Sequence, residues 1–373
     1  MKHILHECYI DGAVHRIHLS EPVIHADNEA MGRSGHLGHA MTEFETGKIV
    51  AFSANSSDKI NGGHNGFGWV EYRISADFGE SFGEPQVFPF SWKCFIDGER
   101  TVAVEKAVTL SDGTVAVFCL MNHTSGTAFW EPWDRPMVIL SRDGCKTWEV
   151  PIFVTPYEGR IYDVLYRDGV VYALELCNNG ENSFISNLPE HLYRLYRSTD
   201  GCRSFEEVSV LPFGIGHAYG NMIFTQEGDL MAFAYNNDDE YSLDYAVSHD
   251  LGKSWTAVGS SYLKNRIRNP QVGMLDGQYI LHGRAGEQKG EPFGAFVLYT
   301  SADAIHWDEG KVLVTGRPAC FYSENITVTM PNGQKRMLVK YSENYRNPSN
   351  SKTIDGKIKS GNVNSMMLYI ETV

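Results

Sequence analysis

The sequence predicts an all-β protein that folds as a six-bladed β-propeller, in which every blade is a four-stranded antiparallel sheet. Two repeated patterns lead to this prediction: a turn of the form Ser-x-Asp is written five times, and a glycine-containing hairpin six times. A four-stranded sheet cannot bury both of its faces alone, and packing several sheets around an axis solves that problem. We therefore expect residues 1–373 to form a single propeller domain.

Each hairpin is a glycine turn between two apolar segments that alternate with a period of two residues. EFETGKIVAF, VTLSDGTVAVF and FTQEGDLMAF show the pattern. β-Branched and aromatic residues on both sides of such a turn are typical of antiparallel strands. A third strand and a short fourth strand follow, as in the segments MVILS and EVPIFV. The six turn glycines are Gly47, Gly113, Gly169, Gly228, Gly277 and Gly333.

The Ser-x-Asp turn ends the third strand of each of the first five units. SADFGESF, SRDGCKTW and STDGCRSF begin at residues 75, 141 and 198, and related segments begin at 248 and 301. Ser and Asp side chains hydrogen-bond the backbone of their own turn, and an aromatic residue after the turn can pack between sheets. We therefore expect the aspartates to stabilise turns rather than to catalyse a reaction. They are Asp77, Asp143, Asp200, Asp250 and Asp303.

The sixth unit lacks a fourth strand in the C-terminal part of the sequence. Its hairpin is followed by a third strand, NSMMLYIETV, whereas the N-terminal segment AVHRIHLSEP has the composition of the missing strand. Pairing of residues near 15–20 with residues near 364–372 would close the ring within one blade. Such closure leaves no open sheet edge at that place.

Composition and charge exclude several classes of protein. The net charge of −14 argues against nucleic acid as a partner, because that binding depends on clustered Lys and Arg. The sequence has no run of about 18 apolar residues, and its first segment, MKHILHECYIDG, lacks the unbroken apolar stretch of a secretory signal. We expect a cytoplasmic protein without a membrane partner.

The sequence indicates neither a metal site nor another cofactor. Its seven cysteines contain no Cys-x-x-Cys pair, so neither a thiolate zinc site nor a disulfide framework is expected. His36 and His39 have a spacing that two metal ligands can share, but the sequence shows no clear third ligand.

The five turns resemble the Asp boxes, or BNR repeats, of the sialidase superfamily, and the count of six units is similar to that of its six-bladed members. The resemblance covers nearly the whole chain as architecture. It implies that the turns lie on the outer rim and that the chemistry lies at a central funnel. Around that funnel the motifs diverge from those of ordinary sialidases.

In such a propeller the first strand of each hairpin lies innermost, and its leading end converges with the others on the funnel. Loops on a rigid scaffold commonly carry binding residues. Arginine pairs with a carboxylate through two parallel hydrogen bonds, so arginines at these places favour an acidic sugar. The predicted substrate-binding residues are Arg33, His36, Arg100, Arg160, Asp163, Tyr219, Arg268 and Arg284.

The predicted catalytic residues are Asp58, Tyr322 and Glu324. The resemblance implies an arginine at the start of the first inner strand, which is Arg33 in MGRSGHLGHA, and an acid/base Asp in the following loop, which is Asp58 in ANSSDKINGG. It also implies a Tyr nucleophile, which is Tyr322 in FYSENITV. Glu324 is two residues further on, which places it on the same face of a strand, where it could serve as the base.

The fourth and fifth units differ from the family pattern. Where the family has a Glu paired with the Tyr, and an Arg one hairpin later, this sequence has Asn221 and Asn236. The fifth unit offers Arg268 and Arg284, which could rebuild a three-arginine site together with Arg33.

These observations favour an exo-acting glycoside hydrolase of the sialidase-like type, acting on an acidic terminal sugar similar to sialic acid. Its partner would be a small acidic saccharide. Two alternatives are open. One is a propeller lyase, or a hydrolase that depends on His and Tyr, acting on glycans that contain uronic acid. The other is a propeller that binds glycans without catalysis.

Overall fold

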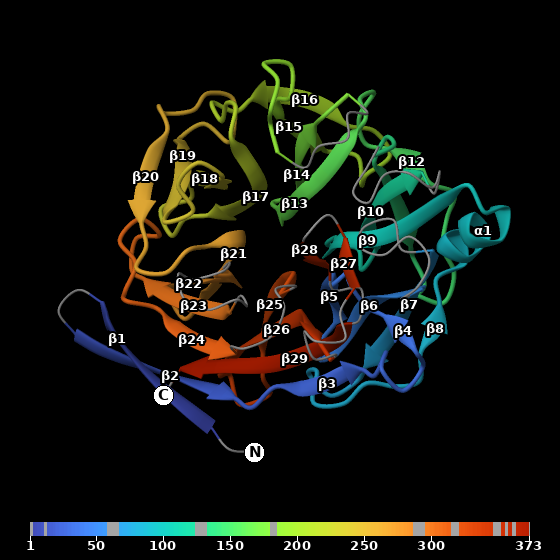
Figure 1. The fold of residues 1–373 in the computed structure, drawn as a ribbon, viewed down its shortest axis with the longest axis horizontal. Helices are drawn as coiled ribbons and strands as arrows, with labels where there is room; N and C mark the ends of the chain where they lie inside the picture. The colour runs from blue at the N-terminus through green and yellow to red at the C-terminus, as the bar shows by residue number, and fades with distance from the viewer. Residues whose placement is uncertain are drawn as a thin grey trace.

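Six antiparallel sheets stand around a central axis in the computed structural model of this chain (Figure 1). They follow one another around the ring in the order of the sequence. This arrangement confirms the predicted all-β fold with six blades of four antiparallel strands. The structure describes residues 3–10, 13–57, 67–123, 133–179, 185–285, 295–314, 321–345, 352–354, 357–359 and 363–372.

The second to fifth blades are regular, with four strands hydrogen-bonded in sequence order. The second blade contains β9 (Arg100–Thr109), β10 (Val115–His123), β11 (Met137–Ser141) and β12 (Ile152–Phe153). The third contains β13 (Gly159–Arg167), β14 (Val170–Cys177), β15 (Tyr193–Ser198) and β16 (Glu206–Val210). The fourth contains β17 (His217–Phe224), β18 (Leu230–Asn236), β19 (Ser242–Ser248) and β20 (Gly259–Tyr262). The fifth contains β21 (Arg268–Leu275), β22 (Gln278–Arg284), β23 (Phe296–Ser301) and β24 (Lys311–Val314).

The first and sixth blades carry additional short strands. In the first blade the inner position is divided between β4 (Arg33–Ser34) and β5 (Met41–Glu45). Both pair with β6 (Lys48–Ser57), which is followed by β7 (Gly68–Ser75) and β8 (Gln86–Val87). The sixth blade contains β25 (Ser323–Thr329), β26 (Lys335–Asn344), β29 (Val363–Thr372) and the N-terminal strand β2 (Ala13–Ser20). In that sheet β1 (His3–Ile10) pairs with β2, and β3 (Val23–Ala26) pairs with β29.

The two ends of the chain close the ring inside the sixth blade, as the sequence predicted. Ile17 of β2 lies opposite Thr372 of β29, and Leu19 lies opposite Ile370. Ile17, Leu19 and Ile370 are buried in the same apolar cluster, so packing reinforces the hydrogen bonds of the ladder.

The first strands of the blades form the inner ring. β5, β9, β13, β17, β21 and β25 each contact the next, and β25 contacts β5. Apolar clusters fill the space between neighbouring blades. Phe52 of the first blade, for example, shares a cluster with Val117 and Ile139 of the second. The central strand β10 is buried on both faces because it lies between two other blades.

The Ser-x-Asp turns are closed by their own side chains. In the second blade the carboxylate of Asp143 accepts hydrogen bonds from the backbone N–H and the hydroxyl of Thr147, at 2.9 and 2.6 Å. These bonds lower the pKa of Asp143 to about 2. The hydroxyl of Ser141 accepts from the N–H of Cys145, whose φ is 66°. The carboxylate accepts backbone hydrogen bonds in the same way at Asp77, Asp200, Asp250 and Asp303.

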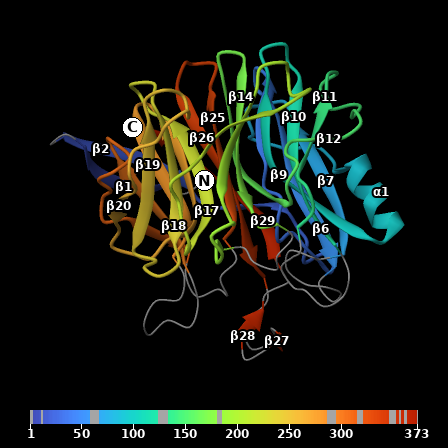
Figure 2. The same cartoon turned by 90° about the horizontal axis from the view of Figure 1, so that it is seen from above.

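Helix α1 (Pro89–Asp97), which the sequence pattern did not indicate, lies on the outside of the ring beside the first two blades (Figure 1). Pro89 stands in its first turn, where a missing N–H costs nothing, and Gly98 ends it with a φ of 75°. A short hairpin of β27 (Lys352–Ile354) and β28 (Lys357–Lys359) projects from one end of the ring (Figure 2). No helix of the described residues is long and apolar enough to cross a membrane.

Candidate active site

A small cavity lies where the leading ends of the inner strands meet. Its volume is about 40 Å³. The wall includes the segment 37–39, which precedes β5. Five inner strands each contribute at least one side chain, and examples are Lys106 from β9, Arg160 from β13, Tyr219 from β17, Gln271 from β21 and Glu324 from β25.

Four inner strands are interrupted by a β-bulge at this cavity. The pairing register shifts at the corresponding places in β9, β13, β17 and β21. A bulge adds one residue that has no partner in the ladder and re-aims its side chain. At two of these bulges the backbone is in the left-handed region: φ is 50° at Tyr219 and 51° at Asn269. The bulged residues that line the cavity are Glu105, Tyr162, Tyr219 and Asn269.

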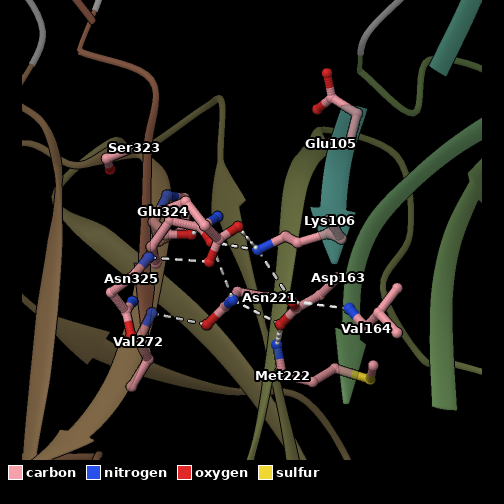
Figure 3. A network of polar contacts seen from close by, with 12 residues as sticks. Glu105, Lys106, Asp163, Val164, Asn221, Met222, Val272, Ser323, Glu324 and Asn325 are labelled. Atoms are coloured by element: carbon pink, nitrogen blue, oxygen red, sulfur yellow. Dashed lines mark hydrogen bonds and ion pairs between the residues drawn. The ribbon is translucent and has the colours of Figure 1, made fainter. Parts of the chain in front are cut away.

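Lys106 lines the cavity, and its side chain lies between Glu324 and Asp163 (Figure 3). We call Lys106 and its three polar partners, Asp163, Gln271 and Glu324, the cavity floor. The ammonium nitrogen of Lys106 lies 3.0 Å from Oδ1 of Asp163, 2.5 Å from Oε2 of Glu324 and 2.6 Å from Oε1 of Gln271. Only 8% of the side chain is exposed, so water does not substitute for these partners. Burial alone would lower the pKa of Lys106, but the two carboxyl groups raise it. The side chain is therefore an ammonium ion.

Asp163 accepts hydrogen bonds from several directions (Figure 3). Its Oδ2 accepts from the backbone N–H of Met222 and from Nδ2 of Asn221, both at 2.6 Å. Its Oδ1 accepts from the backbone N–H of Val164 at 2.9 Å, besides its contact with Lys106. Asp163 therefore contacts Lys106 while backbone and side-chain donors hold its two oxygens in place.

Glu324 has fewer partners than Asp163. Its Oε2 contacts Lys106, and its Oε1 accepts from the backbone N–H of Asn325 at 3.0 Å. Burial raises the pKa of Glu324, and the nearby Asp163 raises it further. The positive charge of Lys106 lowers this pKa, but the net result is a pKa above the ordinary value. A carboxyl group with a raised pKa can hold a proton near neutral pH and deliver it to a substrate.

Arg160 and Glu105 form a second buried ion pair in the cavity wall. Nη2 of Arg160 lies 2.5 Å from Oε2 of Glu105, and the two side chains are 4% and 11% exposed. The guanidinium also lies 4.8 Å from the ring centroid of Tyr162. Among the described residues, Nε and Nη1 of Arg160 and Oε1 of Glu105 have no hydrogen-bond partner. The pair therefore offers two donor nitrogens and an acceptor oxygen to a ligand.

Two phenols meet beside these ion pairs. The hydroxyl oxygens of Tyr219 and Tyr322 are 3.3 Å apart. Burial raises the pKa of Tyr322 well above its ordinary value, so the phenol keeps its proton. The ring of His36 packs edge-to-face on Tyr322 with 5.1 Å between centroids. Burial, and then the charges of Arg284 and Arg160, lower the pKa of His36 to about 3, so its imidazole is neutral.

Both ring nitrogens of His39 lie beside other protein groups. Nε2 of His39 lies 3.3 Å from the backbone oxygen of His36, and its Nδ1 lies 3.5 Å from Nζ of Lys340. Within the described ranges, no group of three His, Cys, Asp or Glu side chains is placed to hold a metal ion.

The structure gathers most of the predicted inner-strand residues at one place. Arg284, at the end of β22, is near enough for its charge to lower the pKa of both His36 and Tyr322. The predicted site residues in the cavity or at its floor are Arg160, Asp163, Tyr219, Tyr322 and Glu324, with His36 packed against Tyr322.

Arg33 has partners within its own blade. It donates to the side-chain and backbone oxygens of Asn55 at 2.6 and 2.7 Å, and its guanidinium carbon lies 4.7 Å from the ring centroid of Trp69. It is not among the residues that line the described cavity. Its predicted role in substrate binding stays a prediction. Asp58 lies outside the described residues, and its role stays a prediction as well.

Arg100 and Arg268 also pair with carboxylates away from the lining of the described cavity. Nε of Arg100 lies 2.7 Å from Asp134, and Nε of Arg268 lies 3.3 Å from Glu240. Arg268 also donates to the hydroxyl of Tyr235 at 3.1 Å. These contacts already use part of the hydrogen-bonding capacity of each guanidinium. Among the arginines of the described residues, Arg160 is the one that lines the described cavity.

Two cavity residues, Lys106 and Glu105, were not among the predicted site residues. Both come from β9, whose sequence RTVAVEKAVT carries two adjacent charges between apolar residues. Strict alternation would send neighbouring side chains to opposite faces. The bulge at Glu105 lets both line the cavity, and a pair of adjacent charges in an inner strand is the signal that could have indicated it.

No protein-family model matches this sequence, and no curated protein matches it. Solved structures do match. A protein of unknown function from Dyadobacter fermentans has a TM-score of 0.70 at 16% identity, with 96% of this chain and 99% of that chain covered. The Hadza microbial sialidase Hz136 has a TM-score of 0.60 at 13% identity, with 86% of this chain and 66% of that chain covered. This chain has the sialidase fold.

A mutant of the NanB sialidase from Streptococcus pneumoniae supports the same conclusion. It has a TM-score of 0.60 at 10% identity, with 93% of this chain and 69% of that chain covered. At such identities the likeness establishes the fold, and one fold can host many activities. The activity must be argued from the side chains of the cavity.

Proposed function

We propose that the protein is a glycoside hydrolase that removes a terminal sugar bearing a carboxylate. One observation carries the proposal: the cavity of a sialidase fold combines a buried arginine, two glutamates and three phenols. Pockets with a few convergent polar groups at the centre of a scaffold are the usual sites of ligands.

Arg160 is the group proposed to bind the carboxylate of the sugar. Nη2 is engaged by Glu105, while Nε and Nη1 have no partner among the described residues. A buried donor without a partner costs about 1–3 kcal/mol, and a bound carboxylate would remove that cost. Arg284, whose charge reaches Tyr322, adds a second positive charge beside the cavity.

Glu324 and Glu105 can divide the proton transfers of hydrolysis. Glu324 gives its proton to the leaving oxygen as the bond between that oxygen and the anomeric carbon breaks. A water molecule adds its oxygen to the anomeric carbon, and its proton passes to the carboxylate of Glu105. Exchange with solvent then restores both groups. The raised pKa of Glu324 supports the first role, and the contact of Glu105 with Arg160 supports the second.

Turnover of matched aryl glycosides tests this proposal. We expect hydrolysis of an aryl glycoside of N-acetylneuraminate or of glucuronate, and none of the corresponding glucoside. Glu324→Gln should lower kcat by about 10²–10⁴-fold, which is the usual effect of losing a general acid. Glu309→Gln, at an exposed position, is the matched control and should keep full activity. Preference for the glucoside, or binding of acidic sugars without any turnover, would reject the proposal.

A second candidate reaction is favoured by the contact of His36 with Tyr322. In a β-elimination on a uronate, a base takes the proton at C5 and the C4–O bond breaks. The electron pair forms a C4–C5 double bond, and an acid protonates the leaving oxygen. The neutral imidazole of His36 could act as base and Tyr322 as acid. A rise in ultraviolet absorbance from the unsaturated product would identify this reaction, and hydrolysis produces no such rise.

A further inference from the structure

Lys106 connects strands on opposite sides of the cavity through protein groups alone. An ammonium ion has three N–H donors, and each finds an acceptor here: Asp163 from β13, Gln271 from β21 and Glu324 from β25. Its donors are therefore engaged before any ligand arrives. Lys106 can therefore influence a reaction in the cavity only through Asp163, Gln271 and Glu324, the residues that it contacts.

One positive charge faces two carboxyl groups at this place. Asp163 receives three hydrogen bonds besides its contact with Lys106, whereas Glu324 receives one. The charged and titratable groups that line the cavity with Lys106, or act on Lys106 or Glu324, are His39, Glu105, Arg160, Tyr162, Asp163, Tyr219, His282, Tyr322, Glu324 and Lys340.

The other described neighbours of Lys106 supply no further positive charge that could pair with a carboxylate at Glu324. Arg160 is paired with Glu105. Burial, followed by the charge of Lys106, lowers the pKa of His282 to about 3, so this residue is a neutral imidazole. Lys340 lies opposite Glu324 in the ladder of β25 and β26, and burial lowers its pKa well below the ordinary value. Glu324 receives fewer hydrogen bonds than Asp163, and burial raises the pKa of Glu324, so we expect Glu324 to be the carboxyl group that holds a proton.

We propose that Lys106 is a positioning residue: it holds the carboxyl group of Glu324 at the cavity floor and stabilises the carboxylate that remains after the proton has left. The inference rests on the proposed function, in which Glu324 protonates the leaving oxygen. Without a cation at this place, loss of that proton would leave two buried carboxylates side by side, which is costly in a medium that solvates charge poorly.

Direct titration of Glu324 tests the proposal without any substrate. Protein labelled with ¹³C at the glutamate carboxyl carbon is titrated by NMR, and the signal that is missing from Glu324→Gln identifies the residue. In the unmodified protein the midpoint should lie above the ordinary value of about 4.3. In Lys106→Met it should rise further, by about one pH unit or more, because the opposing positive charge is gone. Lys264→Met, which removes an exposed lysine paired with Glu309, should leave the midpoint unchanged.

Lys106→Gln provides the same test if Lys106→Met does not fold, because its amide can donate hydrogen bonds without carrying charge. A midpoint of Glu324 at or below its ordinary value in the unmodified protein overturns the proposal, whatever the variants do. So does an unchanged midpoint in either variant that folds.

Kinetics separate positioning from a purely structural role. Lys106→Met should lower kcat on the glucuronide or the N-acetylneuraminide by about 10²-fold or more, with KM changed only a few-fold, because Lys106 has no free donor for the substrate. Lys106→Arg, which keeps the charge, should recover part of kcat. Glycoside turnover that is unaffected by Lys106→Met would overturn the role of Lys106 and leave the proposed function intact. A shifted midpoint without turnover of any glycoside would reject the function and leave the charge relationship standing.

Discussion

The hydroxyl oxygens of Tyr219 and Tyr322 lie 3.3 Å apart, although 103 residues separate them in the sequence. Tyr219 is the bulged residue of β17 in the fourth blade, and Tyr322 precedes β25 in the sixth. The contact therefore joins the fourth and sixth blades at the wall of the cavity. Because burial keeps the proton on Tyr322, this residue can donate a hydrogen bond as it stands but can attack a sugar only if a base takes its proton.

Replacement of Tyr322 by Phe measures the importance of this hydroxyl. Removing one hydrogen bond that is aimed at developing charge costs about 10²-fold or more in kcat, so we expect at least this loss on natural and activated glycosides alike. Tyr262→Phe is the matched control, because Tyr262 is 74% exposed. If Tyr322→Phe retains the kcat of the unmodified protein, the hydroxyl takes no part in the reaction.

The general acid can be identified by comparing how each variant hydrolyses substrates with poor and with good leaving groups. A substrate with a poor leaving group needs protonation, whereas an activated aryl glycoside needs little. Glu324→Gln should therefore lose about 10²–10⁴-fold on the former and much less on the latter. Asp58→Asn is the comparison, because the resemblance to sialidases assigns this role to Asp58. A selective loss in Asp58→Asn, with none in Glu324→Gln, would transfer the role to Asp58.

Binding of free glucuronate by calorimetry tests the assignment of the carboxylate partner. Arg160→Lys should weaken binding by about 1.5–3 kcal/mol, the usual worth of a hydrogen bond to a charged group, because a point charge cannot replace the guanidinium fork. Arg33→Ala tests the sequence-based alternative. Since Arg33 is bound to Asn55 and stacked on Trp69, a loss of affinity equal to that of Arg160→Lys would show that Arg33 leaves these partners for the ligand.

His217 makes the stability of the fourth blade dependent on pH. Nε2 lies 2.8 Å from Oδ2 of Asp244, and Nδ1 lies 2.9 Å from the backbone oxygen of Gly214. Burial lowers the pKa of His217, but these hydrogen bonds outweigh burial and raise it above its ordinary value. A raised pKa means that the contribution to stability is complete below the unfolded value of about 6.5 and is lost as the pH rises through the folded value.

Denaturation by urea at two pH values checks this expectation. His217→Gln should reduce the free energy of unfolding by about 1–2 kcal/mol at a pH near 5, and by clearly less at a pH near 9. His249→Gln, at an exposed histidine, is the control and should show a smaller effect at both. If His217→Gln lowers the free energy of unfolding equally at the two pH values, the charged imidazolium form of His217 does not add to stability.

The six-bladed ring could be predicted from the sequence because each blade repeats the same turn and strand patterns. Glycine turns and period-two strands specify hairpins, and the segment with residues 17–19 has the composition of the strand missing beside β29. The position of Tyr219, Tyr322 and Arg160 at the cavity could be predicted, because the start of each inner strand can be located from the local sequence alone. Lys106 was missed because a bulge at Glu105 breaks the alternation on which such reasoning depends. The partners of Arg33 were not predictable either, since Asn55 and Trp69 reach it through cross-strand geometry.

The four bulges have a consequence for how this architecture can diverge. Glu105, Tyr162, Tyr219 and Asn269 stand outside the regular ladder, so their side chains can be exchanged without altering the pairing of the strands that carry them. Tyr162 and Tyr219 also pack in a buried apolar cluster between blades, whereas Glu105 and Asn269 are polar. Specificity can therefore evolve at Glu105 and Asn269 with little change in the packing between blades, whereas exchanges at Tyr162 and Tyr219 must also preserve that packing.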